Sequence, residues 1–222
     1  MTSEISLNIV KLRAEIPSGV QLIAVSKTKP IGLLFEAYQA GQRVFGENYV
    51  QEITEKQPKM PADTEWHFIG HLQTNKVKYI APFIHCIHAI DSEKLLDEIE
   101  KQAKNNNRQI RCLIQVHIAD EESKFGLSVE EINPFLQKIA QKKYSHVIIC
   151  GLMGMASFTD NEDKVRSEFR LLKTIFDGAK SDYFSNNTNF THVSMGMSGD
   201  WKIAVEEGST MIRIGSALFG QR

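Results

Sequence analysis

Cysteine is scarce in this chain of 222 residues, which holds three: Cys86, Cys112 and Cys150. They lie far apart within apolar stretches, so we expect reduced thiols in the core rather than disulfides or a metal set. The sequence also lacks an H-E-x-x-H, a C-x-x-C, a G-x-S-x-G and a P-loop pattern. These absences argue against the metal, serine-hydrolase and nucleotide chemistries that such motifs carry.

Long apolar runs and an excess of one charge are missing too. No run approaches the roughly 20 residues of a membrane span, and the net charge is −1 without a basic or acidic tail. Neither a nucleic acid nor a membrane is therefore expected as partner. Residues 1–16 carry isoleucine and leucine at helical spacing among charges, which predicts a surface helix and not a signal peptide. We expect a cytoplasmic protein and, because no strong dimer patch can be found, a monomer.

The chain does contain a regular alternation of short apolar runs and longer amphipathic segments. The runs predict eight strands, at residues 21–26, 43–45, 65–69, 86–90, 112–118, 147–152, 191–195 and 210–214. The segments between them predict helices at residues 31–39, 49–55, 75–80, 92–103, 129–142, 162–176 and 201–207. The polar stretch 182–191 is interpreted as a surface loop with some disorder.

Repeated strand–helix units are typical of a parallel sheet, and nearly continuous apolar strands fit burial on both faces. With eight units, the closed solution is the α/β fold of a single (β/α)8 TIM-type barrel, which would take residues 1–222 as one domain. The alternative is an open doubly wound sheet. That fold often carries G-x-G-x-x-G after its first strand, whereas this chain has Ser26-Lys27-Thr28-Lys29-Pro30 there.

Active groups of such a barrel lie at the C-terminal ends of the strands, and the loops after strands seven and eight often bind phosphate. These loops contain Ser198-Gly199-Asp200 and Gly215-Ser216. Glycine lets the backbone approach an anion, serine adds a hydroxyl, and a helix start attracts negative charge. Either segment alone is ordinary turn and cap chemistry. Together, at these two positions, they predict a phosphate site.

Lys27 directly follows the first strand, which puts its amine at the barrel mouth. Low-dielectric walls and a neighbouring cation such as Lys29 favour the neutral amine, which is the form that attacks an aldehyde. The alternative is a pair of solvated lysines at a strand end. Arg213, near the end of an apolar strand, must be paired or face a polar cavity. It could bind a phosphate, bind a ring nitrogen, or form a structural ion pair with a carboxylate such as Glu47.

Other chemistry-bearing side chains are assigned to packing. His67 and His117 lie in predicted strands and are interpreted as hydrogen-bonded core residues, as is, less firmly, His71 at a strand end. Four methionines are expected to form soft packing around a pocket: Met153, Met155, Met195 and Met197. Lys124, in the loop after the fifth strand, is a further amine near the barrel mouth.

Several segments together resemble one known family. They are Ala24–Pro30 (AVSKTKP), Phe45–Glu52 (FGENYVQE), Trp66–Lys76 (WHFIGHLQTNK), Gly151–Met153, Ser194–Ser198 (SMGMS) and Arg213–Ser216 (RIGS). In this order, from near residue 20 to the C-terminus, they are similar to the pyridoxal phosphate homeostasis protein family. The combination covers almost the whole chain and is highly specific.

That resemblance implies a barrel like the N-terminal domain of alanine racemase, of fold-type III, and pyridoxal 5′-phosphate (PLP) as cofactor. It implies a Schiff base between PLP and Lys27, with Lys29 as a neighbouring cation that affects transfer. It assigns Asn48 to the ring hydroxyl and Arg213 to the pyridine nitrogen. The remaining cofactor-binding residues that it implies are Met197, Ser198, Gly215 and Ser216, the last of which is often Thr in the family.

The implied function is intracellular PLP homeostasis, in which the protein buffers PLP and delivers it to PLP-dependent apo-enzymes without catalysis. Two alternatives remain. One is an amino-acid racemase or related enzyme, but an arginine at the pyridine nitrogen makes the ring a poorer electron sink. Racemisation also needs a base on each face, and we expect no residues for the second domain that supplies one in alanine racemase. The other is a Schiff-base aldolase acting on a sugar phosphate.

Overall fold

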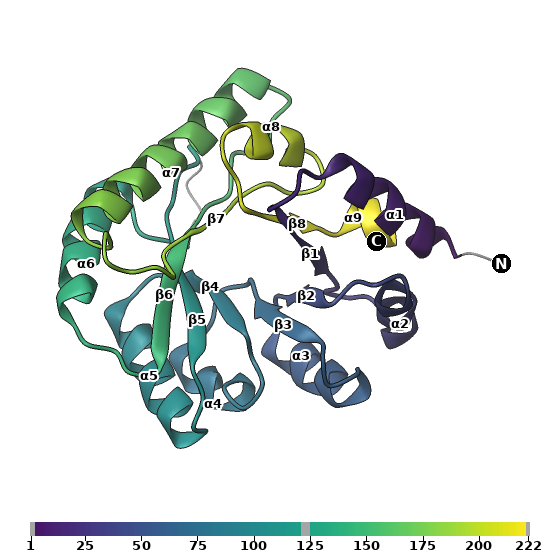
Figure 1. The fold of residues 1–222 in the computed structure, drawn as a ribbon, viewed down its shortest axis with the longest axis horizontal. Helices are drawn as coiled ribbons and strands as arrows, with labels where there is room; N and C mark the ends of the chain where they lie inside the picture. Colours follow the sequence, from purple (N-terminus) through teal and green to yellow (C-terminus); the bar gives the residue numbers. More distant parts are fainter. Residues whose placement is uncertain (1–2, 121–124, 221–222) are drawn as a thin grey trace.

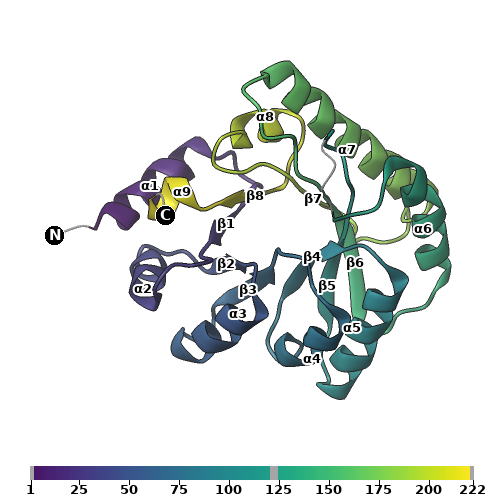
Figure 2. The same ribbon diagram turned by 180° about the vertical axis from the view of Figure 1, so that it is seen from behind.

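The barrel prediction is confirmed by the computed structural model, which describes residues 3–120 and 125–220. Eight parallel strands follow one another around a closed barrel, and helices surround it (Figures 1 and 2). The strands are β1 (Gln21–Val25), β2 (Val44–Glu47), β3 (Glu65–Phe68), β4 (Cys86–Ile90), β5 (Ile110–Gln115), β6 (Val147–Met153), β7 (His192–Ser194) and β8 (Met211–Ile214). Because β1 pairs with both β2 and β8, the sheet has no edges and the open alternative is wrong.

The helices agree with the predicted segments to within a few residues, apart from one long extension and the short last helix at Ser216–Phe219, which was not predicted. They are α1 (Glu4–Glu15), α2 (Ile31–Gln39), α3 (Val50–Lys56), α4 (Val77–Ile80), α5 (Glu93–Asn105), α6 (Val129–Gln141), α7 (Glu162–Asp182), α8 (Trp201–Glu206) and α9 (Ser216–Phe219), with 3-10 turns at Gln57–Lys59 and Thr74–Lys76. Helix α7 ends at Asp182 instead of residue 176. Its start carries a side-chain cap, since Asn161 accepts a hydrogen bond from the Lys164 amide.

Strand side chains alternate between two cores. On β1, Leu22 and Ala24 point outward and pack among the helices, whereas Ile23 belongs to a small cluster inside the barrel. The inner cluster comprises Ile23, Val44, Cys86, Ala89, Leu113, Cys150, Met153 and Met211. Cys112 belongs to the outer core, and all three cysteines are buried free thiols. The same alternation also turns polar side chains inward, among them His67, His88, Ser194 and Arg213.

The predicted surface loop at 182–191 proves to be fixed to the core. Phe184 is 6% exposed and Phe190 is fully buried. Their rings stack with centroids 4.4 Å apart, and Phe190 also stacks on Phe176 of α7 at 5.0 Å. The prediction of a surface loop is confirmed, since residues 183–191 lie outside helices and strands and are mostly exposed. The expected disorder is wrong, because two aromatic side chains among the asparagines and serines bury enough apolar surface to hold the loop.

The two ends of the described chain meet on one side of the barrel. Helix α1 lies beside α9 in both views (Figures 1 and 2), and the Asn8 side-chain amide donates to the Leu218 carbonyl oxygen at 3.1 Å. This contact supports the segment after β8, which carries Gly215 and Ser216. Within residues 3–120 and 125–220, no helix is long and apolar enough to cross a membrane.

Candidate functional site

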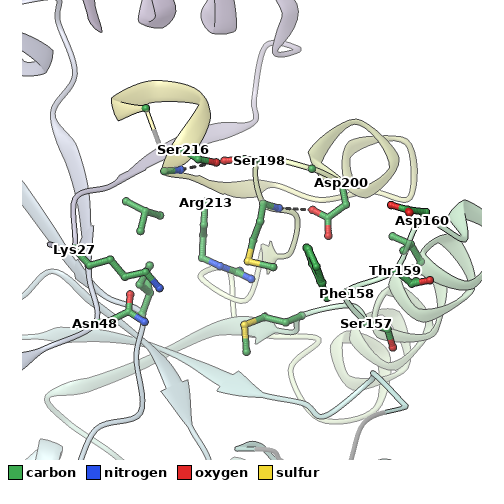
Figure 3. Close-up of a pocket in the computed structure, with 18 of the residues that line it drawn as sticks. Lys27, Asn48, Ser157, Phe158, Thr159, Asp160, Ser198, Asp200, Arg213 and Ser216 are labelled. Atoms are coloured by element: carbon green, nitrogen blue, oxygen red, sulfur yellow. Dashed lines mark hydrogen bonds between the residues drawn. The ribbon is translucent and has the colours of Figure 1, made fainter. Parts of the chain in front are cut away.

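A cavity of about 480 Å³ opens at the C-terminal ends of the strands. Its walls come from the ends of β1, β2, β3, β6, β7 and β8 and the segments that follow them (Figure 3). This volume lies within the usual range for small-molecule sites, about 300–1,000 Å³. The cavity brings together every residue that the sequence assigned to a cofactor site, namely Lys27, Lys29, Asn48, Met197, Ser198, Arg213, Gly215 and Ser216.

The amine of Lys27 enters this cavity from the β1 side. Its side chain, which is half-buried, extends toward Asn48 (Figure 3). Lys29 takes a different direction, since its ammonium donates to the carbonyl oxygens of Phe219 at 3.2 Å and Gly220 at 3.0 Å. The two lysines of the turn therefore differ: Lys27 reaches into the cavity, while Lys29 joins β1 to the end of α9.

Asn48 offers an acceptor to a ligand. Its Oδ1 atom is buried and has no hydrogen-bond partner among the described residues. A buried acceptor of this kind calls for a donor, which a ligand can provide. The end of β3 packs closely behind Asn48, where a Cβ atom at Gly70 would lie only 2.4 Å from the Asn48 carbonyl oxygen. Gly70 is thus needed to let Asn48 sit at this wall.

The opposite wall presents a hydroxyl and backbone amides. Ser198 Oγ accepts hydrogen bonds from the backbone N–H of Gly215 at 3.3 Å and of Ala217 at 3.4 Å. This arrangement joins the loop after β7 to the start of α9, as the two-loop prediction requires. In the loop after β7, the Met197 backbone N–H donates a hydrogen bond to Asp200 Oδ1 at 2.5 Å. Burial raises the pKa of this Asp200 carboxyl.

Arg213 lies between the two walls and is 4% exposed. Its Nη1 donates to the carbonyl oxygen and the hydroxyl of Ser194 at 2.8 and 2.6 Å, and its Nη2 donates to the Gly154 carbonyl oxygen at 3.0 Å. Burial lowers the pKa of Arg213 to about 10, so the guanidinium stays protonated at neutral pH. The suggested ion pair with Glu47 is wrong, because that carboxylate accepts from Lys56 instead.

A chain of hydrogen bonds continues from Arg213 into the barrel. Ser194 Oγ lies 3.0 Å from His88 Nδ1, and His88 Nε2 lies 2.9 Å from His67 Nδ1. Burial lowers the pKa of His67 to about 3 and that of His88 well below its usual value. The core prediction for His67 is confirmed. The Cys86 sulfur lies beside this pair, and it and the ring nitrogens of His67 and His88 are within 4.8 Å of one another. Spacing in the sequence could not reveal this buried group, because β3 supplies His67 whereas β4 supplies Cys86 and His88.

Comparison with known proteins agrees with this geometry. The family described as alanine racemase, N-terminal domain, matches residues 2–222. The pyridoxal phosphate homeostasis protein of Aquifex aeolicus is 40% identical over 203 residues, which cover 91% of this chain and 87% of that protein. The chain belongs to the pyridoxal phosphate homeostasis protein family. The similarity seen in the sequence motifs is therefore confirmed.

Solved structures extend the comparison. PipY of Synechococcus elongatus PCC7942, solved with PLP bound, superposes with a TM-score of 0.89 at 35% identity and covers 98% of this chain and 100% of its own. Alanine racemase from Streptomyces lavendulae has a TM-score of 0.78 at 15% identity, over 98% of this chain and 57% of that one. The second likeness shows a shared fold alone.

Sequence reasoning missed part of this family member's cavity. The loop after β6 supplies a third wall through Ser157, Phe158, Thr159 and Asp160. Their side chains carry no recognisable motif. The Ala217 amide was also missed, because a backbone donor has no residue-type signature. Lys124 lies outside the described residues.

The expectation that four methionines surround a pocket is only partly right. Met155 and Met197 line the cavity, whereas Met153 belongs to the inner barrel cluster and Met195 to the outer core. Met153 ends β6 and Met195 directly follows β7, so both pack at the level of the barrel, whereas Met155 and Met197 lie two residues further along, in the loops that line the cavity. The core prediction for His71 is wrong, because this residue is exposed and lies outside the cavity. Its ring stacks on that of Phe125, with centroids 4.1 Å apart, and its Nδ1 is 3.4 Å from Asp91 Oδ2.

Proposed function

We propose that this chain binds PLP through a Schiff base on Lys27, buffers it, and delivers it to PLP-dependent apo-enzymes. The observation that carries the proposal is one cavity with an inward-pointing lysine on one wall and the Ser198–Gly215 cluster on the other. The family relationship supports it, because the similar PipY structure contains PLP. The proposal takes residues 1–222 as one PLP-binding domain that works as a monomer in the cytoplasm.

The residues present fit this cofactor. PLP supplies a reactive aldehyde when bound. The neutral amine of Lys27 would form a C=N bond with the aldehyde carbon, and the aldehyde oxygen would leave as water with the two hydrogens of the amine. Ser198, Gly215 and Ser216 would hold the phosphate with a hydroxyl and backbone N–H groups. The unpartnered Oδ1 of Asn48 would accept from the ring hydroxyl.

Arg213 favours a carrier over a catalyst. A buried, protonated guanidinium facing the ring nitrogen would donate to it and keep a proton off it. An unprotonated ring withdraws electrons less strongly, which weakens the chemistry that racemases need. Lys29, tied to the α9 carbonyls, would act as a second cation near the phosphate and affect release. A racemase is the alternative, and none of the described residues that line the cavity specifically favours it.

Absorption spectroscopy with amino-acid turnover tests the proposal. Adding PLP to the purified protein should produce the near-visible band of a lysine-bound cofactor, which an aldolase working with a bare lysine would lack. Incubation with L-alanine should give no racemisation above the rate of free PLP. Robust turnover would reject the carrier function, and an unchanged spectrum of free PLP would reject the cofactor site.

A further inference from the structure

Lys27 occupies a tight turn with an unusual backbone. The Lys29 amide donates to the Ser26 carbonyl oxygen at 3.1 Å, which closes a four-residue turn around Lys27 and Thr28. Thr28 has φ of 63°, in the left-handed region that β-branched residues rarely adopt. Turns with a positive φ at this position normally use glycine or asparagine. A strained residue of this kind persists only where its surroundings determine its conformation.

One ion pair holds both neighbours of Lys27. On the N-terminal side, Lys56 Nζ donates to the Ser26 carbonyl oxygen at 2.8 Å. On the C-terminal side, the Thr28 amide donates to Glu52 Oε2 at 2.7 Å. Lys56 and Glu52, one turn apart on α3, are joined through the same Oε2 at 2.8 Å. The backbone on either side of Lys27 is therefore hydrogen-bonded to a single pair of side chains.

A buried carboxylate completes this network beneath the turn. Glu47, at the end of β2, is fully buried, and its Oε1 accepts from Lys56 Nζ at 2.8 Å and from Ser26 Oγ at 2.7 Å. The Lys56 side chain is 11% exposed. Charge-assisted hydrogen bonds in such a dry setting are short and directional, so they restrict the atoms that they join.

We infer that Glu52 and Lys56 are positioning residues that aim the Lys27 amine into the cofactor cavity by holding Thr28 and Ser26. This inference rests on the proposed function. It gives α3 a role in covalent capture, which Glu52 and Lys56 exert through Thr28 and Ser26, the chain neighbours of Lys27. The phosphate of PLP would bind at the opposite wall, at Ser198, Gly215 and Ser216, so its binding would not depend on this network.

Two variants of Glu52 and one control test the inference. Glu52→Ala removes the acceptor of the Thr28 amide, while Glu52→Gln keeps an oxygen for it. Glu55→Ala is the matched control, because Glu55 is an exposed acid on the same helix whose carboxylate accepts a hydrogen bond from the Gln51 side chain. Each protein is mixed with PLP, reduced with borohydride and assayed for the mass of modified Lys27. In parallel, each is titrated with pyridoxine 5′-phosphate, which has an alcohol in place of the aldehyde.

Glu52→Ala should lower the equilibrium constant for covalent capture about tenfold, since small misplacements of a reacting group have effects of this size or larger. Glu52→Gln should stay within about twofold of the wild type, and so should Glu55→Ala. Affinity for pyridoxine 5′-phosphate should be the same in all four proteins, which a merely structural role of Glu52 would not predict.

Capture by Glu52→Ala at the wild-type level would overturn the inference. A parallel loss of pyridoxine 5′-phosphate binding would overturn it as well, because the whole cavity would then have been damaged. Equal losses of covalent capture in Glu52→Gln and Glu52→Ala would contradict the inference that Glu52 acts by accepting a hydrogen bond from the Thr28 amide. A wild-type protein that shows no modification of Lys27 would instead reject the proposed function, so the two failures are distinguishable.

Discussion

The two walls of the cavity are built in different ways. On the β1–β2 side, charged side chains hold the turn around Lys27: Lys56 lies between Glu47 and Glu52 at 2.8 Å from each. On the β7–β8 side, the Ser198 hydroxyl and backbone N–H groups make the wall, and Arg213, between the two walls, is held by the carbonyl oxygens of Ser194 and Gly154.

This difference fits two different tasks. A reacting amine must be aimed, and charge-assisted bonds give the required direction. A phosphate has several equivalent oxygens, so neutral donors at a loop are sufficient to hold it and still let it leave. The charged wall would therefore control covalent capture, and the neutral wall would control anchoring.

Removing the reactive amine gives the largest expected separation of these tasks. Lys27→Ala should abolish covalent capture while pyridoxine 5′-phosphate binds with its wild-type affinity, because the far wall is unchanged. Lys29→Ala serves as the matched lysine control and should retain capture. Titration and the near-visible spectrum measure the two effects. If capture survives in Lys27→Ala, the comparison between the walls fails.

Removing the buried cation should affect folding as well as binding. Arg213→Met leaves the Ser194 and Gly154 acceptors without their donor, and we expect a loss of about 3 kcal/mol in the free energy of unfolding. Arg166→Met, which breaks solvent-screened surface pairs with Glu206 and Glu207, should cost much less. Urea unfolding measures both. Equal losses would mean that Arg213 has no special structural role.

The histidines behind Arg213 should make the neutral wall sensitive to acid. The pKa of His67 is about 3 in the folded state and near 6.5 when unfolded, so between these values the unfolded chain binds more protons. Stability should therefore fall as the pH drops below 6.5, by about 1.4 kcal/mol per pH unit for this histidine. His67→Gln should show a smaller slope than the wild type in urea unfolding between pH 7 and 5. Parallel slopes would contradict this account.

Loss of one hydroxyl should give the smallest effect. Ser198→Ala removes the acceptor shared by the Gly215 and Ala217 amides, and we expect about fivefold weaker binding of PLP, or about 1 kcal/mol. Pyridoxal, which lacks the phosphate, should bind both proteins alike. A loss of the same size for pyridoxal would indicate that Ser198 does not act through the phosphate.

The sequence predicted the barrel well because its signals are local. Eight apolar runs with intervening amphipathic helices fix the fold class, and the barrel rule then assigns Lys27 and Ser198 to the strand ends. The partners of Arg213 escaped prediction because a carbonyl oxygen of any residue can serve. The Glu47–Lys56–Glu52 network escaped it because a β2 residue and two α3 residues meet only after folding.

Peptide mapping of the borohydride-reduced wild-type protein tests the central claim most directly. After incubation with PLP, the added mass should be found on Lys27, in the peptide that contains Ser26 and Thr28. A modification found on Lys29 or Lys124 with Lys27 unmodified, or none at all, would contradict the account.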